Sequence, residues 1–107
     1  MDSLVTDWFA SAKYAGLVLP DGWFGKPYDC VWGLVKTEAK DGCLILFLHE
    51  AGYLLFDHPA DVSVEGSELV IGDFKHCAFS WLGEDGVQRQ EYDSGQVRFV
   101  PIPGWSK

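Results

Sequence analysis

The sequence predicts an α+β domain in which one N-terminal helix packs on a twisted antiparallel meander sheet. Two observations predict it. Apolar residues recur at helical spacing near the start of the chain, and from Val31 onward short β-rich runs alternate with turn residues. A partly open barrel is one form that such a sheet can take, and an all-β sandwich with a peripheral helix is the alternative architecture. Because no linker, repeat or low-complexity tract interrupts the 107 residues, we expect a single domain over residues 1–107.

The N-terminal helix is expected from about Ser3 to Ala15, with boundary errors of a few residues. Its apolar positions follow spacings of one, three and four residues and comprise Leu4, Val5, Trp8, Phe9, Ala12 and Ala15. Asp2 or Ser3 can cap the start of this helix. Gly16 can adopt the left-handed conformation that ends many helices.

Turn residues divide the remainder into short strands, most of them joined as hairpins. The expected strands are Val31–Thr37, Cys43–His49, Tyr53–Asp57, Val62–Glu65, Leu69–Ile71, Cys77–Leu82, Val87–Tyr92 and Gln96–Val100. Cys43–Leu48 is apolar at every position, so we expect a central strand covered on both faces, with the N-terminal helix on one side. Gln96–Val100 is expected at a sheet edge, where two copies of the chain could pair as a homodimer.

The chain carries a strong excess of negative charge. It has 8 Lys and Arg residues against 16 Asp and Glu residues, which gives a formal net charge of −8 at pH 7. A diffuse negative field repels the phosphate backbone of nucleic acids and the surface of an anionic membrane. We therefore expect no nucleic-acid partner and no membrane partner, and we expect attraction toward basic proteins, cations or neutral small molecules.

Cysteine usage indicates a reducing compartment. Cys30, Cys43 and Cys77 are odd in number and far apart, which fits reduced thiols better than a disulfide framework. The first residues lack the basic region of a secretory signal, and the longest apolar run, Cys43–Leu48, is too short to span a bilayer. The sequence therefore predicts a soluble, cytoplasmic protein.

No stretch carries a signature of catalysis. His49, His58 and His76 each lie near a carboxylate in the sequence, but their spacing matches no standard metal motif. The chain also lacks a Cys-x-x-Cys pair, a phosphate-binding glycine loop and a nucleophilic serine elbow. We expect no catalytic residue, no metal ligand and no cofactor, and the residues favour a protein that is not an enzyme.

The segment Gly22–Tyr28 is the most unusual in the chain, because Trp23, Phe24 and Tyr28 stand in a loop bounded by glycine and proline. One interpretation makes these rings the anchor of a protein interface or the mouth of a pocket. The other buries them as a plug over the open end of a barrel. The plug is favoured, since exposed aromatic patches are uncommon on monomers.

In size, acidity and layout the chain resembles the small, mostly uncharacterised bacterial proteins carried on mobile gene cassettes, and also toxin-neutralising immunity proteins. The resemblance rests on composition and transfers no functional residue. It agrees with the leading hypothesis, a non-enzymatic binding protein that engages a basic protein partner through an acidic surface with Trp23, Phe24 and Tyr28 as anchors. The alternative is a small-molecule-binding barrel or minor enzyme whose cavity contains His49 or His76.

Overall fold

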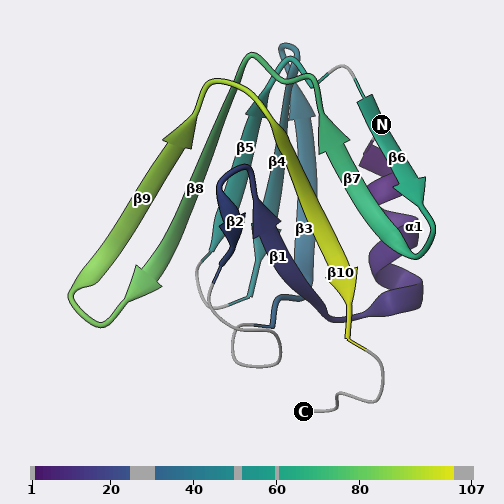
Figure 1. Cartoon of the computed structure of the whole chain (residues 1–107), viewed down its shortest axis with the longest axis horizontal. Helices are drawn as coiled ribbons and strands as arrows, with labels where there is room; N and C mark the ends of the chain where they lie inside the picture. The colour runs from purple at the N-terminus through teal and green to yellow at the C-terminus, as the bar shows by residue number, and fades with distance from the viewer. Residues whose placement is uncertain (1, 25–30, 50–51, 60, 103–107) are drawn as a thin grey trace.

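The computed structural model describes residues 2–24, 31–49, 52–59 and 61–102. Its elements are α1 (Asp2–Ala12), β1 (Ala15–Leu19), β2 (Gly22–Trp23), β3 (Leu34–Lys40), β4 (Cys43–Leu48), β5 (Tyr53–Asp57), β6 (Asp61–Glu65), β7 (Glu68–Gly72), β8 (His76–Gly83), β9 (Gly86–Tyr92) and β10 (Gln96–Pro101) (Figure 1). The strands form two antiparallel sheets of five strands each. Sheet A has the order β2-β1-β10-β7-β6, and sheet B has the order β3-β4-β5-β8-β9.

The N-terminal helix and the antiparallel strands are confirmed, but the strands form two sheets where the sequence predicted one. The hairpins β3–β4, β4–β5, β6–β7 and β8–β9 all occur as expected. The connections after β2, β5, β7 and β9 each carry the chain from one sheet to the other. Three of them have three residues, whereas the β4–β5 hairpin loop has four, so length does not distinguish them. A two-residue turn specifies its own hairpin, but no local signal determines to which sheet a connection of three or four residues leads.

The helix ends earlier than predicted. Lys13 has a φ of 68°, and its amide donates to the carbonyl oxygen of Phe9, so the helical turn closes there. Ala15 already belongs to β1, where it pairs with Pro101 of β10. The apolar run that follows the helix is therefore a strand that the sequence analysis missed.

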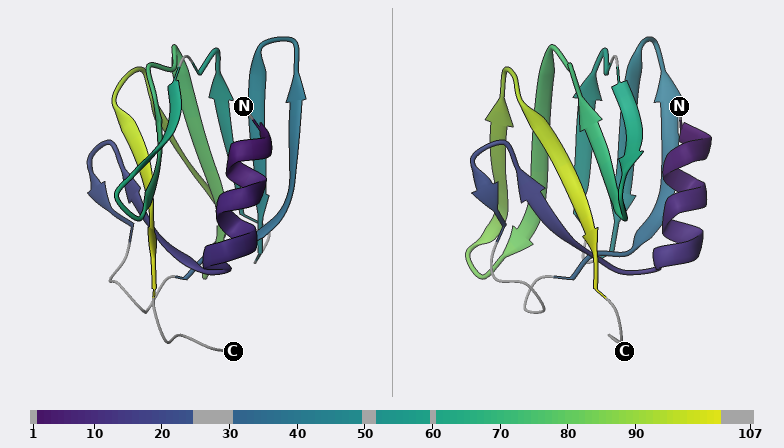
Figure 2. Two further views of the ribbon diagram at one scale, coloured as in Figure 1. Left: turned by 90° about the vertical axis from the view of Figure 1, so that its right-hand side faces the viewer. Right: turned by 45° about the vertical axis from the view of Figure 1, so that its right-hand side comes forward.

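The core lies between the two sheets. Buried side chains from the inner faces fill this space: Leu17, Leu69, Ile71, Val97 and Phe99 from sheet A, and Leu44, Leu46, Leu54, Phe56, Cys77 and Phe79 from sheet B. The helix runs along one side of the two layers, where β3 and β6 form the sheet edges (Figure 2). Val5, Trp8 and Phe9 point into the core from the helix, and Nε1 of Trp8 donates to the carbonyl oxygen of Ser67 over 3.1 Å.

Strand β4 is covered on one face, not on both as predicted. Leu44, Leu46 and Leu48 are buried, whereas Cys43, Ile45 and Phe47 on the opposite face are only half-buried. The physical reason is the position of α1, which uses its apolar side to fill the space beside β3 and β6. In the part of the chain that the structure describes, no element covers the outer face of sheet B.

The predicted edge position of Gln96–Val100 is wrong. Strand β10 pairs with β1 on one side and with β7 on the other, so it is the central strand of sheet A. An edge was expected because β1 was not predicted as a strand, whereas β1 pairs with β10 from Arg98 to Pro101, the last residue of β10. Among the described residues, no helix combines the length and the apolar character that a membrane span needs.

Candidate functional site

The outer face of sheet B is the most distinctive surface of the described residues. Its middle strands direct apolar side chains outward in two neighbouring rows. In one row Phe47 pairs with Tyr53, and in the next row Ile45 pairs with Leu55, which pairs with Ala78. Ala78 is buried, and the other four side chains are half-buried. A solvated sheet face normally carries polar residues, so these apolar rows are typical of a surface that contacts another molecule.

Charged residues from the two edge strands flank these apolar rows. On β3, Nζ of Lys36 lies 3.4 Å from a carboxylate oxygen of Glu38 and 4.8 Å from the centre of the Phe47 ring. On β9, Arg89 pairs with Glu91 over 3.6 Å. An apolar centre with a charged border is the usual anatomy of a protein interface.

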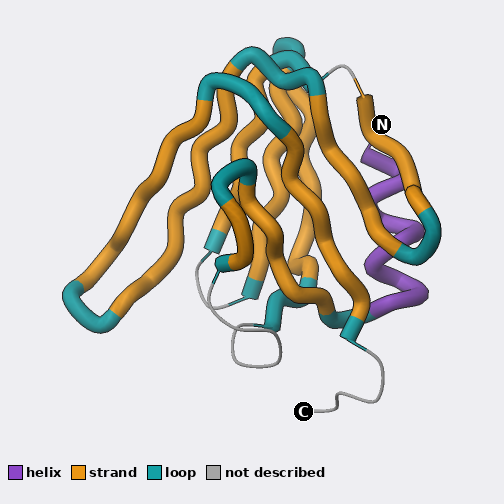
Figure 3. The backbone as a smooth tube through the Cα atoms, viewed as in Figure 1, coloured by secondary structure: helices purple, strands orange, loops and turns teal. Residues whose placement is uncertain are grey.

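One end of the molecule concentrates aspartates, and we call it the aspartate end: Asp41, Asp57, Asp61, Asp73 and Asp93. The loops and strand ends that carry them meet at the upper end in Figure 3, opposite the β8–β9 turn. Backbone hydrogen bonds connect these loops, because the amide of His58 donates to Gly42 and the amide of Lys75 donates to Asp57. The basic side chains at this end are Lys40 and Lys75, so negative charge prevails there.

His76 connects the outer face of sheet B to the aspartate end. Its Nε2 lies 2.8 Å from a carboxylate oxygen of Glu91, and its Nδ1 lies 3.4 Å from Asp93. Asp57 lies beside it on β5. These contacts make His76 a partner of carboxylates, and among the described residues no group of three or more potential ligands is placed to hold a metal ion.

The Cys43 thiol lies at the same end, 3.7 Å from a carboxylate oxygen of Asp57, which in turn contacts Nδ1 of His58. Partial burial raises the pKa of Cys43, and the neighbouring carboxylate of Asp57 raises it further. A protonated thiol is a poor nucleophile. This trio therefore lacks the electrostatics of a catalytic cysteine, because the histidine faces the carboxylate and not the sulfur.

The aromatic residues of the predicted loop lie in different places. Phe24 packs edge-on against Phe79 and Trp81, with ring centres 5.0 and 4.8 Å apart, and is partly buried against the core. Trp23 is 47% exposed and lies over Gly16, since a Cβ atom there would be 2.9 Å from its ring. Tyr28 lies outside the described residues. The structure thus separates Trp23 from Phe24 instead of presenting one aromatic patch.

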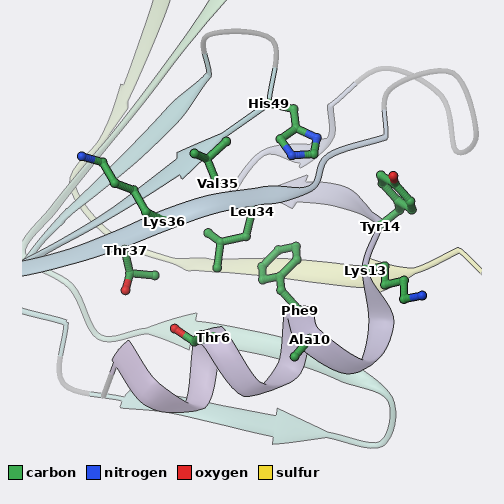
Figure 4. A pocket seen from close by; sticks show the side chains of 10 residues that line it. All are labelled: Thr6, Phe9, Ala10, Lys13, Tyr14, Leu34, Val35, Lys36, Thr37 and His49. Carbon is green, nitrogen blue, oxygen red and sulfur yellow. The ribbon is translucent and has the colours of Figure 1, made fainter. Parts of the chain in front are cut away.

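His49 lines a shallow groove between α1 and β3, with a volume of ≈ 570 Å³ (Figure 4). Phe9 points toward Leu34 across this groove, and Tyr14 lies beside His49 at one end, with ring centres 6.5 Å apart. The charged residues that line the groove are Lys13 and Lys36. His49 therefore reaches a surface groove, while the space between the sheets is filled by apolar side chains.

His49 is held in place by the main chain at Gly33. The amide of His49 donates to the carbonyl oxygen of Gly33 over 3.0 Å, and a Cβ atom on Gly33 would lie 2.8 Å from the imidazole ring. Only glycine leaves room for the ring at this distance.

Comparisons with protein-family models, with curated proteins and with solved structures find no match to this chain. Function is therefore inferred from the geometry alone.

Trp23, Phe24, Tyr28, His49 and His76 were predicted as site residues, but the outward residues of β4 and β5 were not. A signal for these residues was present in the sequence, because Cys43–Leu48 is apolar at every position. A strand that is covered on one face needs apolar residues only at every second position.

Proposed function

We propose that this protein is a non-enzymatic binding protein, and that the outer face of sheet B together with the aspartate end engages a basic protein partner. The observation that carries this proposal is the pair of apolar rows on the outer face, which adjoins the aspartate end through Asp57 and His76. Aromatic side chains supply much of the binding energy of protein interfaces, and Phe47 and Tyr53 are the aromatic residues of these rows, beside the β4–β5 turn.

Charge gives this surface its preference for a basic partner. The formal net charge of −8 attracts cationic proteins at long range, and the aspartate end concentrates that attraction beside the apolar rows. Lys36, Lys40 and Arg89 border the same face, but Lys36 and Arg89 are already paired with Glu38 and Glu91. Steering by charge sets the rate of encounter, while contact with the apolar rows sets the lifetime of the complex.

Two further expectations belong to this proposal. We treat the sheets as a sandwich with a peripheral helix, which is supported by buried side chains on the facing sides of both sheets. We also keep the expectation of a cytoplasmic location, which is supported by Cys43 and Cys77 as free thiols.

Capture of the partner by two variants, one at each end of the molecule, tests the proposal. In the first, Asp41→Asn, Asp73→Asn and Asp93→Asn neutralise the aspartate end. Asp41 and Asp73 have φ values of 54°, a conformation that asparagine tolerates as well as aspartate does, so the backbone is preserved. In the control variant, Glu84→Gln and Asp85→Asn neutralise the β8–β9 turn at the opposite end.

We expect the immobilised wild-type protein and the control variant to retain the same basic protein from a cell lysate, and the aspartate-end variant to lose it. Raising the salt concentration to about 0.5 M should release that protein, because the Debye length then falls below about 5 Å. Retention by the aspartate-end variant, or capture of acidic proteins that resist salt, contradicts the proposal.

A second candidate function is the binding of a small aromatic or aliphatic anion in the groove beside α1. The observation that favours it is the composition of the groove, with Phe9 and Leu34 as apolar walls, His49 at one end and lysines as the charged lining residues. Its volume of ≈ 570 Å³ falls within the range of small-ligand sites.

Benzoate serves as the probe for this second candidate, followed by chemical shifts of the protein amides. Saturable binding below about 10 mM that His49→Ala and Gly33→Ala weaken would support the candidate, because the alanine at Gly33 displaces the His49 ring. His58→Ala, at the aspartate end, is the matched control. The candidate fails if the shifts do not saturate or if the control weakens binding equally.

A further inference from the structure

Strand β9 is the open edge of sheet B. It pairs with β8 on one side, and within the described parts of the chain nothing pairs with its other side. Residues 87–91 are exposed, and Val87 is 74% exposed. Prolines and β-bulges are two of the features that normally protect an edge strand against pairing with another strand. Strand β9 contains no proline, and its ladder with β8 has no register shift.

The backbone groups that face this open side belong to Val87, Arg89 and Glu91. Oγ of Ser80 donates to the carbonyl oxygen of Gln88 over 3.3 Å, which places that carbonyl on the β8 side of the strand. The direction of backbone groups alternates along a strand. The amide and carbonyl groups of Arg89 and Glu91 therefore point away from β8 and are available to another strand.

The side chains of Arg89 and Glu91 lie on the outer face of sheet B, because Arg89 pairs with Ser80 and Glu91 pairs with Ala78 on that face. If a second β9 strand pairs antiparallel with a two-fold axis at Gln90, Arg89 of each copy lies opposite Glu91 of the other. Opposite charges directly across a ladder stabilise it, and like charges destabilise it. The sequence around Gln90 is therefore complementary to itself in this register.

We propose that a second copy of this chain docks on β9, so that two β9 strands pair antiparallel about Gln90 and join the two B sheets into one continuous sheet. Arg89 of each copy then forms two backbone hydrogen bonds and one ion pair with Glu91 of the other copy. The proposal does not depend on the proposed function, because self-association is measured on the isolated protein.

Neighbouring registers are disfavoured by charge. A two-fold axis at Arg89 would place the two Arg89 side chains opposite each other, and an axis at Glu91 would do the same with two carboxylates. A two-fold axis between two residues would pair Arg89 or Glu91 with a residue whose backbone groups face β8. Those groups are already directed to β8, so such a register cannot form the hydrogen bonds of the new ladder. Among the axes at Arg89, Gln90 and Glu91, the axis at Gln90 satisfies the backbone and places opposite charges across the ladder.

This arrangement would place both outer faces on the same side of the joined sheet, because the two-fold axis is perpendicular to it. The apolar rows of the two copies would then form one longer surface. A partner with two contact sites would bind it with higher avidity than it binds a single copy.

A charge-swap cycle on β9 tests the dimer by sedimentation equilibrium at protein concentrations up to about 1 mM. Arg89→Glu or Glu91→Arg places like charges opposite each other twice per dimer, so each should raise the dissociation constant about tenfold or more. The double variant Arg89→Glu/Glu91→Arg restores opposite pairs and should return the constant to within about threefold of the wild-type value.

The matched control makes the same swaps on β3, with Lys36→Glu alone and with Lys36→Glu/Glu38→Lys. Lys36 and Glu38 form the corresponding pair on the other edge of sheet B, and their exchange should leave the dissociation constant unchanged. A protein that is monomeric at about 1 mM overturns the proposal. So does a dimer that responds to the β3 swaps, or one that the double variant on β9 fails to restore.

Disulfide trapping provides a second, independent readout of the register. Gln90 would lie on the two-fold axis in a pair without backbone hydrogen bonds, where the Cα atoms approach to about 4.5 Å and a disulfide can close. Gln90→Cys should therefore form a covalent dimer faster than Gln88→Cys under the same mild oxidation. Equal rates, or a faster reaction of Gln88→Cys, contradict pairing about Gln90.

Discussion

At the scale of single residues, Tyr92 shows how a contact between the two sheets depends on protonation. Its hydroxyl group, on β9 of sheet B, lies 3.1 Å from a carboxylate oxygen of Asp21 in the turn between β1 and β2 of sheet A. Burial raises the pKa of Tyr92 to about 12, and the hydrogen bond to Asp21 adds to the shift. The neutral phenol is thus the form that stabilises the folded protein.

We predict that this contribution is present below pH 10 and is lost as the pH rises from about 10 through about 12, because the unfolded chain ionises its tyrosines near pH 10. Tyr92→Phe should lower the free energy of unfolding by about 1 kcal/mol at pH 7, and this difference should shrink or reverse above pH 10. Denaturant unfolding of both proteins at several pH values measures it. A difference that stays constant up to pH 12 would contradict the raised pKa.

At the scale of elements, α1 acts as a side wall for both sheets. Trp8 is 9% exposed and donates to the turn between β6 and β7, while Phe9 packs edge-on against Phe99 of β10 with ring centres 5.1 Å apart. The helix therefore stabilises sheet A directly and covers the edge of sheet B at β3. The exposed side of the helix contributes little to this packing, as Leu4 is 36% exposed.

Substitutions of Trp8 should separate packing from hydrogen bonding. Trp8→Ala should lower the free energy of unfolding by about 3–5 kcal/mol, through the cavity that it leaves. Trp8→Phe should lower it by about 1–2 kcal/mol, since it keeps most of the ring but leaves the Ser67 carbonyl without its donor. Leu4→Ala, on the same helix, should change it by less than about 1 kcal/mol. Equal effects of Trp8→Ala and Leu4→Ala would show that α1 is not anchored in this way.

The elements also show what a sequence can and cannot predict. Asp41-Gly42 and the β8–β9 turn specify their hairpins locally, and both have positive φ values where glycine is needed, at Gly42 and Gly86. The position of β10 between β1 and β7 depends on contacts far apart in the chain, so an edge was predicted in error. Apolar periodicity identified β4 as an interior strand of its sheet but could not say whether its second face meets a covering element.

The candidate site was harder to predict than the fold for the same reason. Phe24 and Trp23 are adjacent in the sequence, yet one packs against the core and the other against Gly16. His49 and His76 were singled out for their chemistry, but their roles depend on neighbours from other strands, such as Gly33 and Glu91. Residue type suggested the chemistry, whereas the tertiary arrangement decided which groups meet.

At the scale of the whole molecule, the important property is the uneven distribution of charge over a small particle of 35 × 34 × 23 Å. The aspartate end lies next to the apolar rows of sheet B, while Glu84 and Asp85 lie at the far end of the β8–β9 hairpin (Figure 1). A cationic partner that responded only to the net charge of −8 would bind acidic residues everywhere. A partner that recognises the proposed surface should bind one end.

Titration of the isotopically labelled protein with a short lysine peptide, followed by amide chemical shifts, tests this claim most directly. We predict shifts in the loops that carry Asp41, Asp57, Asp73 and Asp93 at about 20 mM salt, and their loss in the variant with Asp41→Asn, Asp73→Asn and Asp93→Asn. The variant with Glu84→Gln and Asp85→Asn should keep them. Shifts spread equally over the β8–β9 turn and the aspartate end, or unchanged in the first variant, would contradict the existence of a directed acidic binding surface.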